Sequence, residues 1–130
     1  MKKVALYCRV STDTQEKGET IENQLRDLYR AYDKKEIVKV YTDNPASGAD
    51  LERKGLSELR EDAQRGLFDV VGVWDSSRLA RDVKWALVLR DELKENGVQI
   101  EIMGKERDDS ETGKLFSVLE ATMDELERER

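Results

Sequence analysis

Short apolar runs that alternate with helix-patterned segments constrain the fold of this chain more than any other feature. The runs fall at residues 4–8, 37–41, 68–74 and 98–102. Between and after them, apolar residues recur every three or four positions, as they do on one face of a helix. This alternation predicts a three-layer α/β domain. It should hold a four- to five-stranded, mainly parallel sheet flanked by helices, with a long C-terminal helix.

Capping and turn residues place the ends of the expected helices. Thr20 is a typical N-cap for the first helix, while Gly66 and Gly97 end the second and third. The last helix is predicted to start near Thr112 and is still helical in pattern at Arg130. We therefore expect an α/β catalytic core at 1–111 and the start of a long oligomerisation helix at 112–130. The chain is interpreted as the N-terminal fragment of a longer protein.

The composition excludes several classes of function. The chain of 130 residues contains no His and one Cys, which excludes Ser-His-Asp triads, Cys-His dyads, an internal disulfide and most zinc sites, but leaves carboxylate-bound magnesium open. Its net charge of −6 argues against a self-sufficient DNA-binding protein, because duplex affinity depends on Lys and Arg. No apolar run is long enough for a membrane span or signal peptide, so a cytoplasmic location is expected.

Arginines follow the expected strands, at the points where those strands end. Arg9 and Ser11 follow the first strand, Arg53 lies in the loop after the second, and Arg78 and Arg81 follow the third. Ligands of an open parallel sheet bind beyond the carboxyl ends of its strands, and planar guanidinium groups suit phosphate. The pattern therefore predicts an anion site. The alternative is a set of solvated arginines in surface salt bridges.

Four motifs, in order along the chain, resemble those of the serine site-specific recombinases, the family of resolvases, invertases and large serine integrases. Two positions depart from the common pattern: Ser77 stands where an aspartate is frequent, and Asp62-Ala63 stand where many resolvases carry a lysine. The motifs are Tyr7-Cys8-Arg9-Val10-Ser11-Thr12 with Gln15, Ser47-Gly48 with Glu52-Arg53-Lys54-Gly55-Leu56, Ser77-Arg78-Leu79-Ala80-Arg81, and Glu127-Arg128.

The resemblance implies DNA strand exchange by phosphoryl transfer, with no metal, ATP or other cofactor. Ser11 would attack a backbone phosphate and form a 5′-phosphoserine bond. Arginines would stabilise the charge on the phosphoryl oxygens: Arg9, Arg78 and Arg81 as the primary clamp, joined by Arg53 when its loop closes. Gln15 would orient Ser11 or an oxygen. The group that accepts the serine proton stays open between an arginine, a carboxylate such as Asp75, and the phosphate itself.

The resemblance also implies partners. The full-length protein would bind duplex DNA at specific recombination sites through a missing C-terminal domain, and would form homodimers that pair into tetramers. Within this chain, the DNA contacts would come from Arg9, Arg53, Arg78, Arg81 and Arg128. The helix at 112–130 would form the dimer interface, through the apolar stripe of Leu115, Leu119, Met123 and Leu126.

Two other interpretations remain open. One is a non-enzymatic flavodoxin-like or receiver-like regulatory module that binds a small anion, although such a module has no need of Ser11 with its surrounding arginines. The other is a recombinase-derived domain that is inactive alone, and the isolated domain is expected to be inactive. Cys8, flanked by apolar residues at a strand end, is predicted to be a buried structural thiol rather than a nucleophile.

Overall fold

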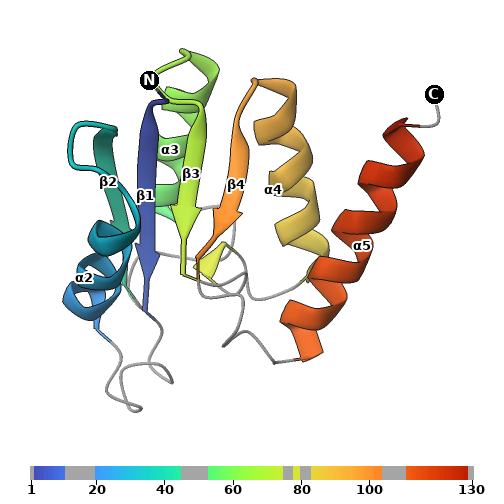
Figure 1. The fold of residues 1–130 in the computed structure, drawn as a ribbon, viewed down its shortest axis with the longest axis horizontal. Helices are drawn as coiled ribbons and strands as arrows, with labels where there is room; N and C mark the ends of the chain where they lie inside the picture. The colour runs from blue at the N-terminus through green and yellow to red at the C-terminus, as the bar shows by residue number, and fades with distance from the viewer. Residues whose placement is uncertain are drawn as a thin grey trace.

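The fold is a parallel sheet between layers of helices (Figure 1). The computed structural model describes residues 2–10, 20–44, 53–74, 78–79, 83–103 and 111–128. The described residues form a four-stranded sheet in the order β2-β1-β3-β4, and every pair in it is parallel. The predicted fold class is confirmed. The strands are β1 (Val4–Arg9), β2 (Ile37–Asp43), β3 (Val70–Val73) and β4 (Gln99–Ile102).

Four described helices surround this sheet: α2 (Ile21–Ala31), α3 (Lys54–Gln64), α4 (Val83–Glu95) and α5 (Glu111–Arg128). Helix α2 covers one face, α3 and α4 cover the other, and α5 lies outside α4 (Figure 1). The Thr20 side chain accepts a hydrogen bond from the Asn23 backbone N–H, so it caps α2 as predicted. Gly66 and Gly97 follow α3 and α4 with positive φ, the backbone conformation that favours glycine at helix ends.

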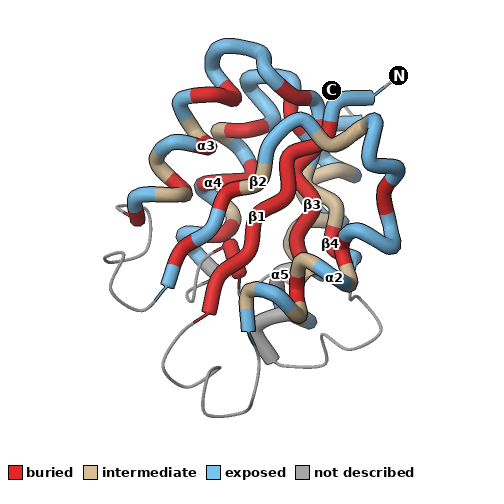
Figure 2. The backbone as a smooth tube through the Cα atoms, turned by 90° about the vertical axis from the view of Figure 1, so that its left-hand side faces the viewer, coloured by how far each residue is buried: buried red, intermediate tan, exposed pale blue. Residues whose placement is uncertain are grey.

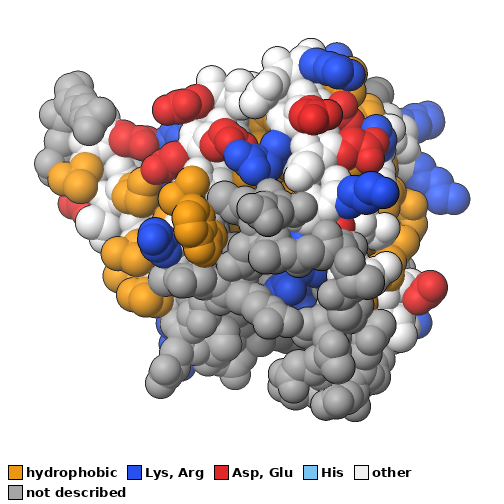
Figure 3. Space-filling view, turned by 180° about the vertical axis from the view of Figure 1, so that it is seen from behind, with side chains coloured by type: hydrophobic (Ala, Val, Ile, Leu, Met, Phe, Trp, Pro, Cys, Tyr) orange, Lys and Arg blue, Asp and Glu red, His pale blue; other side chains and the backbone are white. Residues whose placement is uncertain are grey.

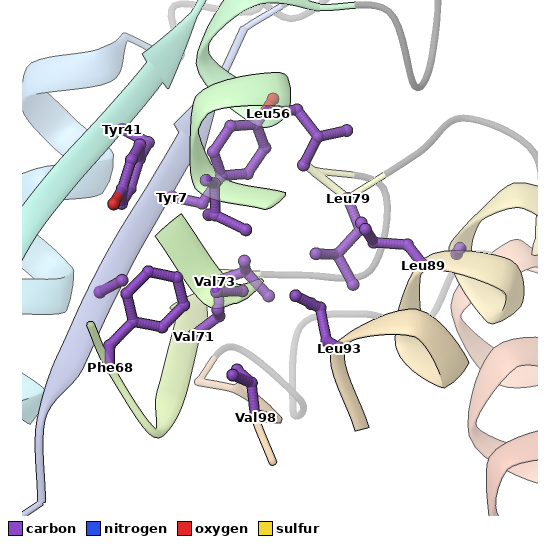
Figure 4. Close-up of a cluster of buried hydrophobic side chains, with 14 of the residues drawn as sticks. Tyr7, Tyr41, Leu56, Phe68, Val71, Val73, Leu79, Leu89, Leu93 and Val98 are labelled. Carbon is purple, nitrogen blue, oxygen red and sulfur yellow. The ribbon is translucent and has the colours of Figure 1, made fainter. Parts of the chain in front are cut away.

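The central strand β1 is buried on both faces, and its whole length is red in Figure 2. Ala5 and Tyr7 join the core beneath α3 and α4, part of which is drawn in Figure 4. Leu6 and Cys8 belong to the second core, together with Leu28 of α2. This alternation follows from the two-residue period of a strand, so Arg9, two residues after Tyr7, shares the face turned toward α3.

Strand β3 is shorter than the predicted run of 68–74. Phe68 is buried but lies before the strand, where its ring packs edge-on against Tyr41 with centroids 6.0 Å apart. The reason is local, because the Leu67 N–H still donates to the Asp62 carbonyl in the last turn of α3. The chain therefore joins the sheet only after it has left the helix.

Ion pairs attach α5 to α4. Arg90, 7% exposed, pairs with Glu120 at 3.1 Å and with Asp124, and Lys94 pairs with Asp124 at 3.7 Å and with Glu127. Helix α5 begins one residue before the predicted start. None of the helices in the described ranges is long and apolar enough to cross a bilayer.

Candidate functional site

Three arginines lie at the carboxyl end of the sheet, next to β1, β3 and the start of α3. Arg9 is the last residue of β1, Arg78 follows β3, and Arg53 directly precedes α3. Their exposed fractions are 7%, 6% and 2%, so all three are buried. The structure thus places Arg9, Arg53 and Arg78 at the predicted end of the sheet. Ser11, Gln15 and Arg81 lie outside the described residues.

Arg53 joins β1 to the segment after β3. Its Nη1 donates to the Tyr7 hydroxyl oxygen at 3.1 Å and to the Arg78 carbonyl oxygen at 3.3 Å. The resemblance implies that Arg53 joins the site when its loop closes. In this structure the guanidinium is already packed against its neighbours.

Asp43, at the end of β2, organises the contacts around Arg53. Its Oδ2 accepts from the Tyr7 hydroxyl at 2.7 Å and from the Leu56 backbone N–H at 2.9 Å, and its Oδ1 accepts from the Gly55 N–H at 2.8 Å. Arg53, at the N-cap position, gives no side-chain cap bond. A carboxylate from the neighbouring strand therefore caps α3, where it also complements the helix dipole.

Tyr7 connects Asp43 to Arg53 as a neutral phenol. Burial, together with the hydrogen bond to Asp43, holds the pKa of Tyr7 well above its ordinary value, although the nearby Arg53 charge opposes this. The protonated hydroxyl donates to Asp43 and accepts from Arg53. A carboxylate can only accept hydrogen bonds and a guanidinium can only donate them, so the Tyr7 hydroxyl must donate to Asp43 and accept from Arg53.

Gly55 allows α3 to start directly against the end of β2. A Cβ atom at this position would lie 2.4 Å from the Thr42 carbonyl oxygen and 2.9 Å from Asp43 Oδ2. Ordinary van der Waals contacts of a Cβ begin at 3.4 Å. The glycine in this motif is therefore required by the close approach of two backbone segments.

The backbone of Arg9 is held from two sides. The Gln24 side chain, 1% exposed, accepts from the Arg9 N–H at 3.2 Å, and its Nε2 donates to the Arg9 carbonyl at 2.9 Å. On the other side, the Val10 N–H donates to the Asp43 carbonyl at 3.3 Å. The end of β1 is thus tied to both α2 and β2.

Cys8 is a buried structural thiol, as predicted. It is fully buried, and burial raises its pKa to about 12 although the Arg78 charge acts in the opposite direction. A thiol with this pKa is protonated near neutral pH and makes a poor nucleophile. Within the described part of the chain, no group of three or more acidic or Cys side chains is arranged to hold a metal ion.

Arg128 is not brought to this cluster. It is exposed and is the last residue of α5, whose C-terminal end lies opposite the carboxyl ends of the strands (Figure 1). Sequence reasoning also gave no role to Tyr7, Asp43 or Gln24. A signal for Gln24 did exist, because it precedes Leu28 by four residues and so places an amide on the apolar face of α2.

Comparison with known protein families shows to which family this chain belongs. The family model described as "Resolvase, N terminal domain" matches residues 4–130. The chain belongs to the resolvase family of serine recombinases. This confirms the resemblance inferred from the four motifs, and the regulatory-module interpretation is not favoured.

Individual relatives agree with this assignment. A DNA recombinase of Bacillus subtilis (strain 168) is 35% identical over 126 residues, which are 96% of this chain and 25% of that protein. The DNA-invertase of Enterobacteria phage P7 is 32% identical over 88 residues, which are 67% of this chain and 46% of that protein. The crystal structure of the N-terminal catalytic domain of TP901-1 integrase is 34% identical, covers 98% of both chains and has a TM-score of 0.72. This chain therefore spans a quarter to a half of the two curated relatives.

Proposed function

We propose that this chain is the catalytic part of a longer recombinase that cleaves and rejoins DNA at specific sites. The Ser11 oxygen attacks a backbone phosphorus, the bond from phosphorus to the 3′ oxygen breaks, and the leaving 3′ oxygen takes up a proton. The DNA 5′ end is then held as a phosphoserine ester. Because one phosphate ester replaces another, rejoining to a new 3′ hydroxyl needs no ATP.

The observation that carries the proposal is the buried arginine cluster at the end of the sheet. The chain has a net charge of −6, yet Arg9, Arg53 and Arg78 are each less than 10% exposed and lie at one site. Donors held in place before the reaction stabilise charge that develops on phosphoryl oxygens. We assign Arg9, Arg78 and Arg81 to the primary clamp and Arg53 to its support.

The remaining assignments complete the proposal. Gln15 orients Ser11 or a phosphoryl oxygen, and Arg128, at the far end of α5, contacts DNA away from the cleaved phosphate. The proton acceptor for Ser11 stays open between an arginine, a carboxylate such as Asp75 and the phosphate. The reaction as written uses neither metal nor nucleotide cofactor, and the isolated chain is expected to be inactive.

Helix α5 is proposed to pair subunits into dimers that assemble as tetramers. Hydrophobic side chains gather on the side of the molecule where α5 lies, at the left of Figure 3. On α5, Leu115 and Leu126 are 48% and 56% exposed, and Leu119 and Met123 are half-buried. Exposed apolar side chains on one helix support an interaction surface there.

The nucleophile can be tested by trapping the covalent intermediate. The full-length recombinase is incubated with its recombination-site DNA and denatured, and protein attached to DNA 5′ ends is measured. The unmodified protein and a Ser57→Ala control, changed on α3, should form the adduct, and Ser11→Ala should not. An adduct that persists in Ser11→Ala would show that another residue attacks the phosphate.

A further inference from the structure

Gln24 is the least exposed of the buried polar residues in the described ranges, at 1%. It lies on the inner face of α2, one turn before Leu28, which packs on β1. Within the described ranges its amide makes two hydrogen bonds, and both go to the backbone of Arg9. Packing of α2 alone would not require a buried amide here, so the role of Gln24 lies with the Arg9 backbone.

The Gln24 amide gives the Arg9 backbone the hydrogen bonds that a neighbouring strand gives to the earlier residues of β1. In the described residues, the pairing of β1 with β3 runs from Val4 to Leu6. The Val10 N–H points to β2, where it meets Asp43, and the backbone groups of successive residues in a strand point in opposite directions. Those of Arg9 therefore point toward the β3 side, beyond the end of that pairing. The Gln24 amide takes the place of a neighbouring strand. It bonds to the Arg9 backbone N–H and carbonyl, which would be costly to bury without hydrogen bonds.

We infer that Gln24 is a positioning residue for DNA cleavage, which fixes the end of β1 that carries Arg9 and leads to Ser11. The inference rests on the proposed function, since it gives Arg9 and Ser11 their roles. In the described part of the chain, the Gln24 side chain bonds to the Arg9 backbone, so its effect on cleavage would pass through that backbone. A displacement of only about 1 Å at a reacting group can cost about a hundredfold in rate.

The substitution Gln24→Glu separates positioning from packing, because its hydrogen bonding depends on pH. A glutamate carboxylate can accept from the Arg9 N–H but places a second oxygen against the Arg9 carbonyl. A protonated carboxyl has nearly the shape of the amide and restores the missing donor. Burial raises the pKa of a carboxyl group. The charged residue it touches is Arg9, whose side chain leaves β1 on the face of Ala5 and Tyr7, opposite α2, by the alternation of a strand.

Cleavage is measured for the full-length recombinase between pH 5.5 and pH 8, always relative to the unmodified protein at the same pH. At pH 8, Gln24→Glu should cleave at least about tenfold more slowly, with DNA affinity unchanged. As the pH falls, its relative rate should recover toward that of the unmodified protein. Gln24→Met, which has similar length but neither donor nor acceptor, should stay slow throughout. The matched control Gln64→Glu, on the exposed end of α3, should match the unmodified protein.

A second measurement uses the 130-residue chain and does not depend on activity. Hydrogen-exchange protection of the Arg9 amide, followed by NMR, should fall in Gln24→Met at every pH, and in Gln24→Glu only at the higher pH. Circular dichroism at each pH identifies any variant that has unfolded, and Gln24→Met then provides the comparison if Gln24→Glu does not fold.

The outcomes distinguish this inference from the proposed function. Loss of Arg9 protection with normal cleavage, or a relative rate of folded Gln24→Glu that does not change with pH, would overturn the positioning role. An adduct formed by Ser11→Ala would overturn the proposed function instead, and would leave the contact between Gln24 and Arg9 unaffected.

Discussion

Replacing Gly55 with alanine should destabilise the protein, although alanine is the better helix former. The new Cβ would lie 2.4 Å from the Thr42 carbonyl oxygen, about 1 Å closer than an ordinary contact. Because that oxygen belongs to the backbone of β2, no side-chain rotation can relieve the overlap. The start of α3 would have to move away from β2.

The size of the effect follows from that movement. A shift of about 1 Å would stretch the bonds from Gly55 and Leu56 to Asp43, now 2.8 and 2.9 Å, beyond hydrogen-bonding range. Loss of a helix cap costs about 0.5–2 kcal/mol, and overpacking costs about 1–3 kcal/mol. The better helix propensity of alanine returns about 1 kcal/mol. The balance is a destabilisation of about 2 kcal/mol.

Urea unfolding followed by circular dichroism measures this change. With a slope of about 2 kcal/mol per molar urea, typical of small domains, the midpoint should fall by about 1 M. Glu61→Ala, an exposed change in the same helix, serves as the control and should leave the midpoint nearly unchanged. If Gly55→Ala were as stable as the unmodified chain, or more stable, the close approach of α3 to β2 would not be what requires glycine.

Three further outcomes are expected. Arg78→Lys keeps the charge but loses the planar fork, so adduct formation should slow at least about tenfold, and a near-normal rate would contradict a clamp role. Met123→Lys with Leu126→Lys should dissociate dimers of the full-length recombinase in sedimentation without loss of helicity, whereas unchanged dimers would exclude α5 as the interface. The Tyr41 hydrogen bond, with Lys39, holds the pKa of Asp62 below its usual value of about 3.9. Its contribution to stability is therefore present above about pH 4 and lost at lower pH, so acid should destabilise Asp62→Asn less steeply, and an identical pH dependence would rule this out.

A strand could be predicted from the sequence where the residues that pair through their backbone also carry apolar, buried side chains. Residues 37–41 were predicted from their apolar pattern, but β2 continues through Thr42 and Asp43, which pair with Cys8 and Arg9. Those two residues are polar, so the hydrophobic pattern ends before the backbone ladder does. The helix ends were easier to predict, since Gly66 and Gly97 have a local conformational requirement that does not depend on distant contacts.

The arginines of the site could be predicted because parallel strands bring their carboxyl ends together. The residues that hold them could not, since their roles depend on contacts between distant segments. Asp43 lies 36 positions from Tyr7, and Gln24 lies 15 positions from Arg9. In the sequence, Asp43 begins a run of turn-forming residues and has no visible connection to the start of α3. Only the packed sheet shows that its carboxylate caps α3.

Burial argues against one of the two interpretations that the sequence left open for Arg9, Arg53 and Arg78, that of solvated arginines in surface salt bridges. A solvated surface arginine resembles Arg26, whose side chain is 59% exposed and whose ion-pair distance to Asp27 is 3.9 Å. Arg53, at 2% exposure, instead contacts a buried phenol and a backbone carbonyl. Burying a guanidinium costs solvation that must be offset by well-placed partners, and such placement is of little use to a merely solvated charge. It does suit a site in which donors must already be aimed when phosphoryl charge develops.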